Sequence, residues 1–183
     1  MVLTQYVTAT TLDGYIADAD NSLDWLFAVE REDGGEGFAA FLADVGAMAM
    51  GATMYEWVVD HEQLLEHPER WQASYADRPC WVFGHRELAP IPGADVRFVQ
   101  GDVAAVQPAM VEAAAGRNVW LVGGGDLVGQ FHDAGLLDQV RVSIAPVTLG
   151  AGAPLLPRRI EGLRLVSVER NGQMVDLAFD VQR

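Results

Sequence analysis

The sequence predicts an α/β fold, in which a mostly parallel sheet is flanked by helices and ends in a C-terminal antiparallel hairpin. Short segments rich in β-branched and aromatic residues alternate with segments whose apolar residues recur every three to four positions. This alternation is typical of a parallel sheet covered by helices. Near the end, two alternating segments joined at Asn171-Gly172 predict the hairpin. With 183 residues, half of them hydrophobic, residues 1–183 are expected to form one domain.

The first quarter of the chain predicts a strand, a long loop and two helices. Val2–Ala9 is the strand, and turn residues from Thr10 to Asn21 predict the loop. Asn21 or Ser22 would cap a short helix. After the acidic, glycine-rich residues 32–37, helical spacing predicts an amphipathic helix from four apolar residues, Phe38, Phe41, Leu42 and Val45.

The remaining elements alternate between strand and helix. The predicted strands are Ala47–Met50, Trp81–Phe83, Val96–Val99, Val119–Val122, Val140–Ile144, Leu163–Glu169 and Val175–Val181. A helix is predicted from Val103 to Ala114 and another around Leu127, Val128 and Phe131. Residues 58–78 are polar and mixed, and Pro68 breaks any single helix there.

Composition excludes several classes of protein. The formal net charge is −14 and every basic residue is an arginine, so lysine chemistry and a basic nucleic-acid-binding face are both excluded. The chain has no apolar run long enough for a membrane span and no basic segment at its start, and one cysteine rules out an internal disulfide. We therefore expect a cytoplasmic protein that binds neither nucleic acid nor membrane.

The sharpest local motif is Val119-Trp-Leu-Val-Gly-Gly-Gly-Asp-Leu-Val, in which an apolar strand passes through three glycines into a helix. Such a junction presents free amides and the positive end of a helix dipole to an anion. The Rossmann fingerprint fails because Val128 stands where its last glycine is needed, and no P-loop lysine is present. An anion-binding site and a merely tight turn both remain open from this motif alone.

Several motifs in the same order carry a family resemblance. They are Thr11-Leu-Asp-Gly-Tyr-Ile-Ala, Met50-Gly-Ala-Thr-Met-Tyr-Glu, Gly123-Gly-Gly-Asp-Leu, Phe131-His-Asp-Ala-Gly-Leu-Leu-Asp-Gln-Val and Ala145-Pro-Val-Thr-Leu-Gly-Ala-Gly. Together they resemble the dihydrofolate reductase-like superfamily, in the branch of the C-terminal reductase domain of the bifunctional riboflavin-biosynthesis deaminase-reductase. The resemblance spans nearly the whole chain and is most specific from Gly123 to Gly152.

The resemblance implies a stand-alone reductase that uses NADPH, with NADH also possible, on a small heterocyclic or sugar-linked substrate of pterin, flavin or aminopyrimidine type. It also implies a homodimer, which the strand Val140–Val147 and the following loop would help to build. The residues that it assigns to the cofactor are Ile16 and Ala17 in a loop over the nicotinamide, Gly51, Ala52, Thr53 and Met54 under the phosphates, Gly84, His85 and Arg86 near the adenosine phosphate, and Gly123, Gly124, Gly125, Asp126 and Leu127 on the pyrophosphate and nicotinamide side.

The sequence departs from the family pattern after Gly51. The family usually has Gly-Arg-x-Thr where Gly51-Ala-Thr stands, so the phosphate-binding arginine is missing and the spacing is shortened or shifted. Arg86 could supply the charge, bidentate to a 2′-phosphate, or be a solvated surface residue.

The protein must also align donor and acceptor and supply a proton. Asp13 is a candidate for substrate binding or proton relay, although Asp-Gly is also a common turn. Glu30 follows Trp25 at a spacing that resembles the tryptophan and acid of folate reductases, and Glu36 could serve equally well. No metal site is predicted. The competing hypothesis is a non-catalytic nucleotide-binding protein that kept the fold and lost the chemistry.

Overall fold

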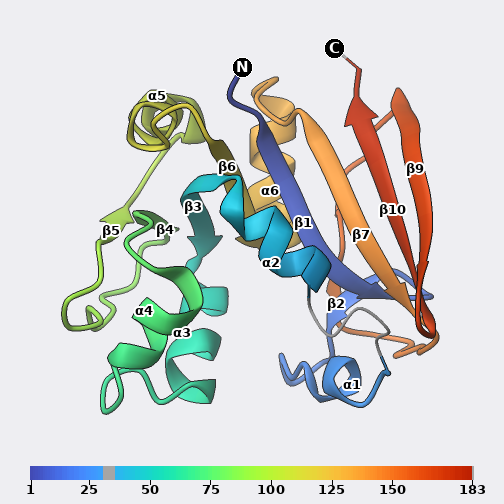
Figure 1. Ribbon diagram of the computed structural model, residues 1–183, viewed down its shortest axis with the longest axis horizontal. Helices are drawn as coiled ribbons and strands as arrows, with labels where there is room; N and C mark the ends of the chain where they lie inside the picture. Colours follow the sequence, from blue (N-terminus) through green and yellow to red (C-terminus); the bar gives the residue numbers. More distant parts are fainter. Residues whose placement is uncertain (31–35, 183) are drawn as a thin grey trace.

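The core of the molecule is an eight-stranded sheet in the order β5-β4-β3-β6-β1-β7-β10-β9 (Figure 1). It is seen in a computed structural model that describes residues 1–30 and 36–182. The strands are β1 (Thr4–Thr11), β3 (Val45–Gly51), β4 (Cys80–Phe83), β5 (Val96–Val99), β6 (Asn118–Gly123), β7 (Gln139–Ala145), β9 (Leu163–Asn171) and β10 (Met174–Val181). Neighbours from β5 to β7 pair in parallel, whereas β10 is antiparallel to both β7 and β9. The predicted fold class is confirmed.

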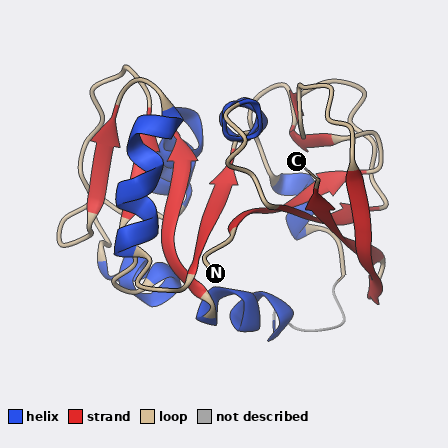
Figure 2. Cartoon of the chain, turned by 90° about the horizontal axis from the view of Figure 1, so that it is seen from above, coloured by secondary structure: helices blue, strands red, loops and turns tan. Residues whose placement is uncertain are grey.

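Helices cover both faces of this sheet (Figure 2). The helices of the described residues are α1 (Asp24–Phe27), which buries no residue, α2 (Glu36–Ala43), α3 (Ala52–His61), α4 (Glu69–Tyr75), α5 (Val103–Ala113) and α6 (Gly125–Asp133). One hydrophobic core includes residues of α5 and α6, among them Met110, Val128 and Phe131. The other core, which α2, α3 and α4 cover, includes Phe41 and Trp71.

The strand β3 shows why a central parallel strand has a nearly continuous apolar sequence. Ala47 and Ala49 belong to the core under α5 and α6, whereas Met48 and Met50 belong to the other core. Successive side chains of a strand point to opposite faces, so both faces of β3 must be apolar when helices cover both. The prediction for Ala47–Met50 is therefore confirmed.

Two predictions about the first quarter of the chain are wrong. Val45 was assigned to the helix by its spacing from Phe41, but it is the first residue of β3 and is fully buried. The predicted loop after Ala9 contains the end of β1 and a short strand, β2 (Tyr15–Ala17), which pairs with β8 (Ala153–Pro154). This pairing joins residues far apart in sequence, so no local pattern could indicate it. The acidic residues 32–35 lie outside the described part of the chain.

The end of the chain matches the predicted hairpin, with a shifted turn. Asn171 pairs with Met174, so the turn consists of Gly172 and Gln173 rather than Asn171-Gly172. The strand β7, predicted to help build a dimer, is paired on both sides by β1 and β10, so its edges are not available to a second chain. Among the described residues, no helix has the length and apolar character needed to cross a bilayer.

Replacing Phe131 by alanine tests the core under α6. Phe131 is fully buried and its ring meets that of Phe83 edge to face at a centroid distance of 6.1 Å. Phe131→Ala is expected to lower the free energy of unfolding by about 3–5 kcal/mol, measured by urea denaturation, because a cavity remains. Leu65→Ala, at a side chain with 47% exposure, is the control and should cost about 1 kcal/mol or less. Equal losses in the two variants would contradict this account of the core.

Candidate functional site

A cavity of about 750 Å³ lies where β1, β3, β4 and β6 end. In open α/β sheets, ligands bind outside the carboxyl ends of the strands. Every residue predicted to bind the cofactor lines this cavity, namely Ile16, Ala17, Gly51, Ala52, Thr53, Met54, Gly84, His85, Arg86, Gly123, Gly124, Gly125, Asp126 and Leu127. The structure thus brings together four segments that are far apart in the sequence.

Two helices begin at this cavity without a side-chain cap. The cap residue of α3 is Gly51 and that of α6 is Gly124, and neither can offer a side-chain oxygen to the first amides of its helix. The first residues of both helices line the cavity. Two sets of amide donors and two positive helix ends therefore lie at one cavity, an arrangement suited to a pyrophosphate.

The turn between β6 and α6 depends on glycine at two positions. Gly123 has φ of 149°, a backbone conformation that other residues rarely adopt, and the bond between Gly123 and Gly124 is cis. Gly125 lies directly against the main-chain carbonyl groups of Pro154 and Leu155, so a β-carbon there would overlap with them. The first turn of α6 is therefore packed against the segment 153–158.

Arg86 stands at the end of the cavity next to β4. Its Nη2 donates a hydrogen bond to Thr53 Oγ1 at 2.9 Å, and its Nη1 lies 2.6 Å from Glu56 Oε2. Thr53 and Glu56 belong to successive turns of α3, so the arginine joins the loop after β4 to that helix. This is the predicted substitute for the missing arginine, placed beside the first turn of α3.

Several other residues that line the cavity are apolar. Ile16 and Ala17 come from β2, Leu23 is the cap residue of α1 and Leu26 lies within that helix, and Trp57 lies in α3 one turn after Thr53. The short helix α1 contacts α3 through aromatic rings: Phe27 stacks on His61 with a centroid distance of 5.4 Å, and His61 on Trp57 at 4.5 Å. The apolar side chains that line the cavity suit contact with a flat, uncharged ring.

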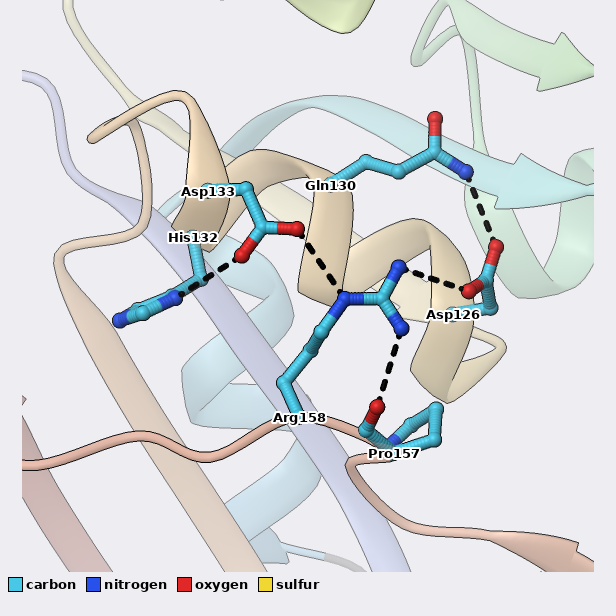
Figure 3. Close-up of polar contacts among 6 residues, drawn as sticks. All are labelled: Asp126, Gln130, His132, Asp133, Pro157 and Arg158. Carbon is cyan, nitrogen blue, oxygen red and sulfur yellow. Dashed lines mark hydrogen bonds and ion pairs between the residues drawn. The ribbon is translucent and has the colours of Figure 1, made fainter.

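The side chain of Arg158 holds the segment 153–158 against α6 (Figure 3). Its Nη2 lies 2.9 Å from Asp126 Oδ1 and its Nε 3.0 Å from Asp133 Oδ2, and its stem packs against Gly129. Hydrogen bonds from Gln130 and then Arg158 lower the pKa of Asp126. Arg158 is the main cause of the lowered pKa of Asp133. Asp126 is thus an ionised carboxylate paired with a cation at the cavity.

The two predicted catalytic acids are not among the residues that line the cavity. Asp13 accepts hydrogen bonds from the hydroxyl of Thr11 and from the amides of Leu149 and Gly150, and the bonds from Thr11 and then Gly150 are the main causes of its lowered pKa. These contacts join the loop before β2 to the loop after β7, which is a positioning role. Glu30 is exposed, and its main-chain carbonyl accepts a hydrogen bond from Gln173. The side chain of Glu36 is outside the described part of the chain.

The sequence reasoning missed several lining residues. Trp57 was interpreted as a packing residue, but it lines the cavity one helical turn after Thr53 and Met54. That i+3 or i+4 spacing from residues already assigned to the site was a usable signal. Leu26 is brought there by α1, and Pro154 by the pairing of β8 with β2, which no local signal indicates.

The fold indicates the class of protein to which this chain belongs. A mostly parallel sheet with an antiparallel C-terminal hairpin is a fold that this chain shares with solved RibD structures. The family model described as the RibD C-terminal domain matches residues 4–177, and the chain belongs to this family.

Individual relatives agree with this assignment. The uncharacterized protein YwjB of Bacillus subtilis is 32% identical over 175 residues, which are 93% of each protein. A candidate riboflavin biosynthesis protein of Shewanella sp. PV-4 superposes with a TM-score of 0.80 at 23% identity, covering 99% of both chains. RibD of Acinetobacter baumannii superposes with a TM-score of 0.68 at 16% identity, and this chain covers 58% of it. At these identities the two structures show a shared fold.

Arg158→Ala tests the contact between the segment 153–158 and α6. Both aspartates have a lowered pKa in the folded protein, so their contribution to stability is present above the ordinary value of 3.8 and is lost as the pH falls through the lowered pKa. The variant should have a lower urea midpoint at neutral pH. Between about pH 5 and 2 its midpoint should fall less than that of the wild type. Parallel pH profiles would contradict the role of Arg158; Arg159→Ala, at a highly exposed neighbour, is the control.

Proposed function

We propose that this protein is an NAD(P)H-dependent reductase, with NADPH as the expected cofactor, that transfers a hydride to a small heterocyclic or sugar-linked substrate. The observation that carries the proposal is the pair of uncapped helix N-termini, of α3 and α6, at a cavity of about 750 Å³. Helix ends of this kind bind phosphate groups, and the family relation supports a reductase.

The order of strands predicts how an extended dinucleotide would lie. Arg86 stands at β4, the two helix ends at β3 and β6, and Ile16 and Ala17 near β1 and β2. From β4 to β1 there are three interstrand steps, about 14 Å in all. The adenosine is therefore expected near Arg86, the pyrophosphate between the helix ends and the nicotinamide under β2.

When bound, the reduced nicotinamide supplies the hydride. The residues of this chain would hold the hydride donor and the acceptor in the correct relative position and exclude water from them. Leu23, Leu26 and Trp57 would place a flat ring against the nicotinamide, since they are apolar residues that line the cavity. Asp13 would keep the loop that carries β2 in place through its bonds to Leu149 and Gly150.

Titration with NADPH and NADH, followed by quenching of tryptophan fluorescence, tests the cofactor. Trp57 lines the cavity and provides a signal. We expect NADPH to bind, and Arg86→Ala to weaken NADPH by about 10- to 100-fold, the usual value of a charge-assisted hydrogen bond, with little effect on NADH. Arg70→Ala on α4 is the matched control. Failure of the wild type to bind either dinucleotide would reject the proposal.

Measuring turnover distinguishes the reductase hypothesis from its alternative, a nucleotide-binding protein without catalysis. Oxidation of NADPH should be followed with pterin, flavin and aminopyrimidine acceptors. Trp57→Ala is expected to raise KM for an accepted substrate by about tenfold, since ring stacking in the pocket is lost, while NADPH binding changes little. Binding of NADPH without oxidation by any acceptor would favour the non-catalytic alternative.

We also propose that the protein forms a homodimer through β9 rather than through β7. The edge strand β9 carries exposed apolar side chains, with Leu165 at 52% and Val168 at 59% exposure. An apolar edge strand promotes association unless it is covered, and a second copy would cover it.

Solution mass tests the dimer. The wild type should sediment at twice the chain mass of 19.9 kDa. Val168→Asp should sediment as a monomer, because it would place a charge in the apolar contact. Leu65→Asp, at an exposed side chain away from β9, should remain dimeric. A wild type of 19.9 kDa would exclude the proposed dimer.

A further inference from the structure

The arginine at the adenosine end of the cavity already has an anionic partner within the protein. Arg86 Nη1 lies 2.6 Å from Glu56 Oε2, and Arg86 Nη2 donates to Thr53 Oγ1. Arg86 and Thr53 line the cavity, and Glu56 follows Thr53 by one turn of α3. Glu56 is thus held at the margin of the site by the residue proposed to bind the cofactor.

This pair can open when a ligand arrives. The side chains of Arg86 and Glu56 are 53% and 40% exposed. Ion pairs between side chains that are this exposed contribute little to the stability of the fold, about 0–1 kcal/mol. A phosphate group is a stronger partner for a guanidinium, because it offers several charged oxygens to the same set of donors.

The two possible cofactors differ in what they bring to this position. A 2′-phosphate must compete with the carboxylate of Glu56 for Arg86, and both groups are negative, so the carboxylate opposes it. A 2′-hydroxyl is neutral, so it does not compete with that carboxylate for Arg86. Arg86 therefore favours the phosphorylated ribose, and Glu56 reduces this preference.

We propose that Glu56 is a specificity-determining residue, which limits the preference of this site for a 2′-phosphorylated dinucleotide by competing for Arg86. The proposal rests on the proposed cofactor site. In this proposal the side chain of Glu56 on α3 affects which ligand binds. This role is separate from the phosphate contacts that the first turn of α3 would make.

The substitution Glu56→Gln removes the charge and keeps an acceptor oxygen for Arg86. Binding of NADPH, NADH, 2′,5′-ADP and 5′-ADP should be measured by calorimetry at constant ionic strength. Glu56→Gln is expected to tighten NADPH and 2′,5′-ADP by about three- to tenfold, and to change NADH and 5′-ADP by less than about twofold. Glu112→Gln, at an exposed carboxylate of α5, changes the net charge equally and should alter no affinity.

Measuring the effect of Glu56→Gln in the Arg86→Ala background tests whether Glu56 acts through Arg86. If Glu56 acts by competing for Arg86, most of the gain in affinity from Glu56→Gln should disappear in the double variant. An equal gain for NADPH and NADH, or an unchanged affinity for 2′,5′-ADP, would overturn the role of Glu56 while leaving the cofactor site in place. A wild type that binds none of the four probes would instead overturn the cofactor site itself, and this role with it.

Discussion

The candidate site depends on a close approach between two pieces of main chain. The segment 153–158 lies so near the first turn of α6 that Gly125 contacts the carbonyl groups of Pro154 and Leu155. Leu155 also donates its amide to the carbonyl of Gly14, and its carbonyl accepts the hydroxyl of the buried Tyr6. One short segment thereby fixes the start of α6, the loop before β2 and the core relative to one another. Any side chain at position 125 would separate them.

Any attraction of an anion to this junction must come from nearby groups, because the protein as a whole repels anions. The formal net charge is −14, yet the cavity is lined by the first amides of two helices and by Arg86. Asp126 would oppose an anion at the start of α6, but it is paired with Arg158 and accepts a hydrogen bond from Gln130. Since screening by water weakens distant charges more than groups in contact, local donors can outweigh the net charge.

Sequence reasoning succeeds here where structure is determined by neighbours in the chain. The alternation of Val119–Val122 with the apolar stripe of Leu127 and Phe131 is a local signal, and both elements form as predicted. The pairing of Tyr15–Ala17 with Ala153–Pro154 joins segments from opposite ends of the sequence, so it could not be predicted. The same limit applies to Asp13: its Asp-Gly turn is visible in the sequence, but its partners Leu149 and Gly150 are not.

Main-chain groups form one part of the cavity lining and side chains form another, and this difference predicts which positions would affect the choice of ligand. The part of the lining that is proposed to hold phosphate consists mainly of glycines and helix amides, which are main-chain donors and do not depend on side-chain identity. A fold shared at 16–23% identity is compatible with such a site, because glycine and helix geometry can persist while most side chains change. Under the proposed function, the side chains that would distinguish ligands are Arg86 and Glu56, and the apolar lining residues Leu26 and Trp57. Substitutions at these few positions are therefore expected to change the choice of ligand, whereas the main-chain donors would remain.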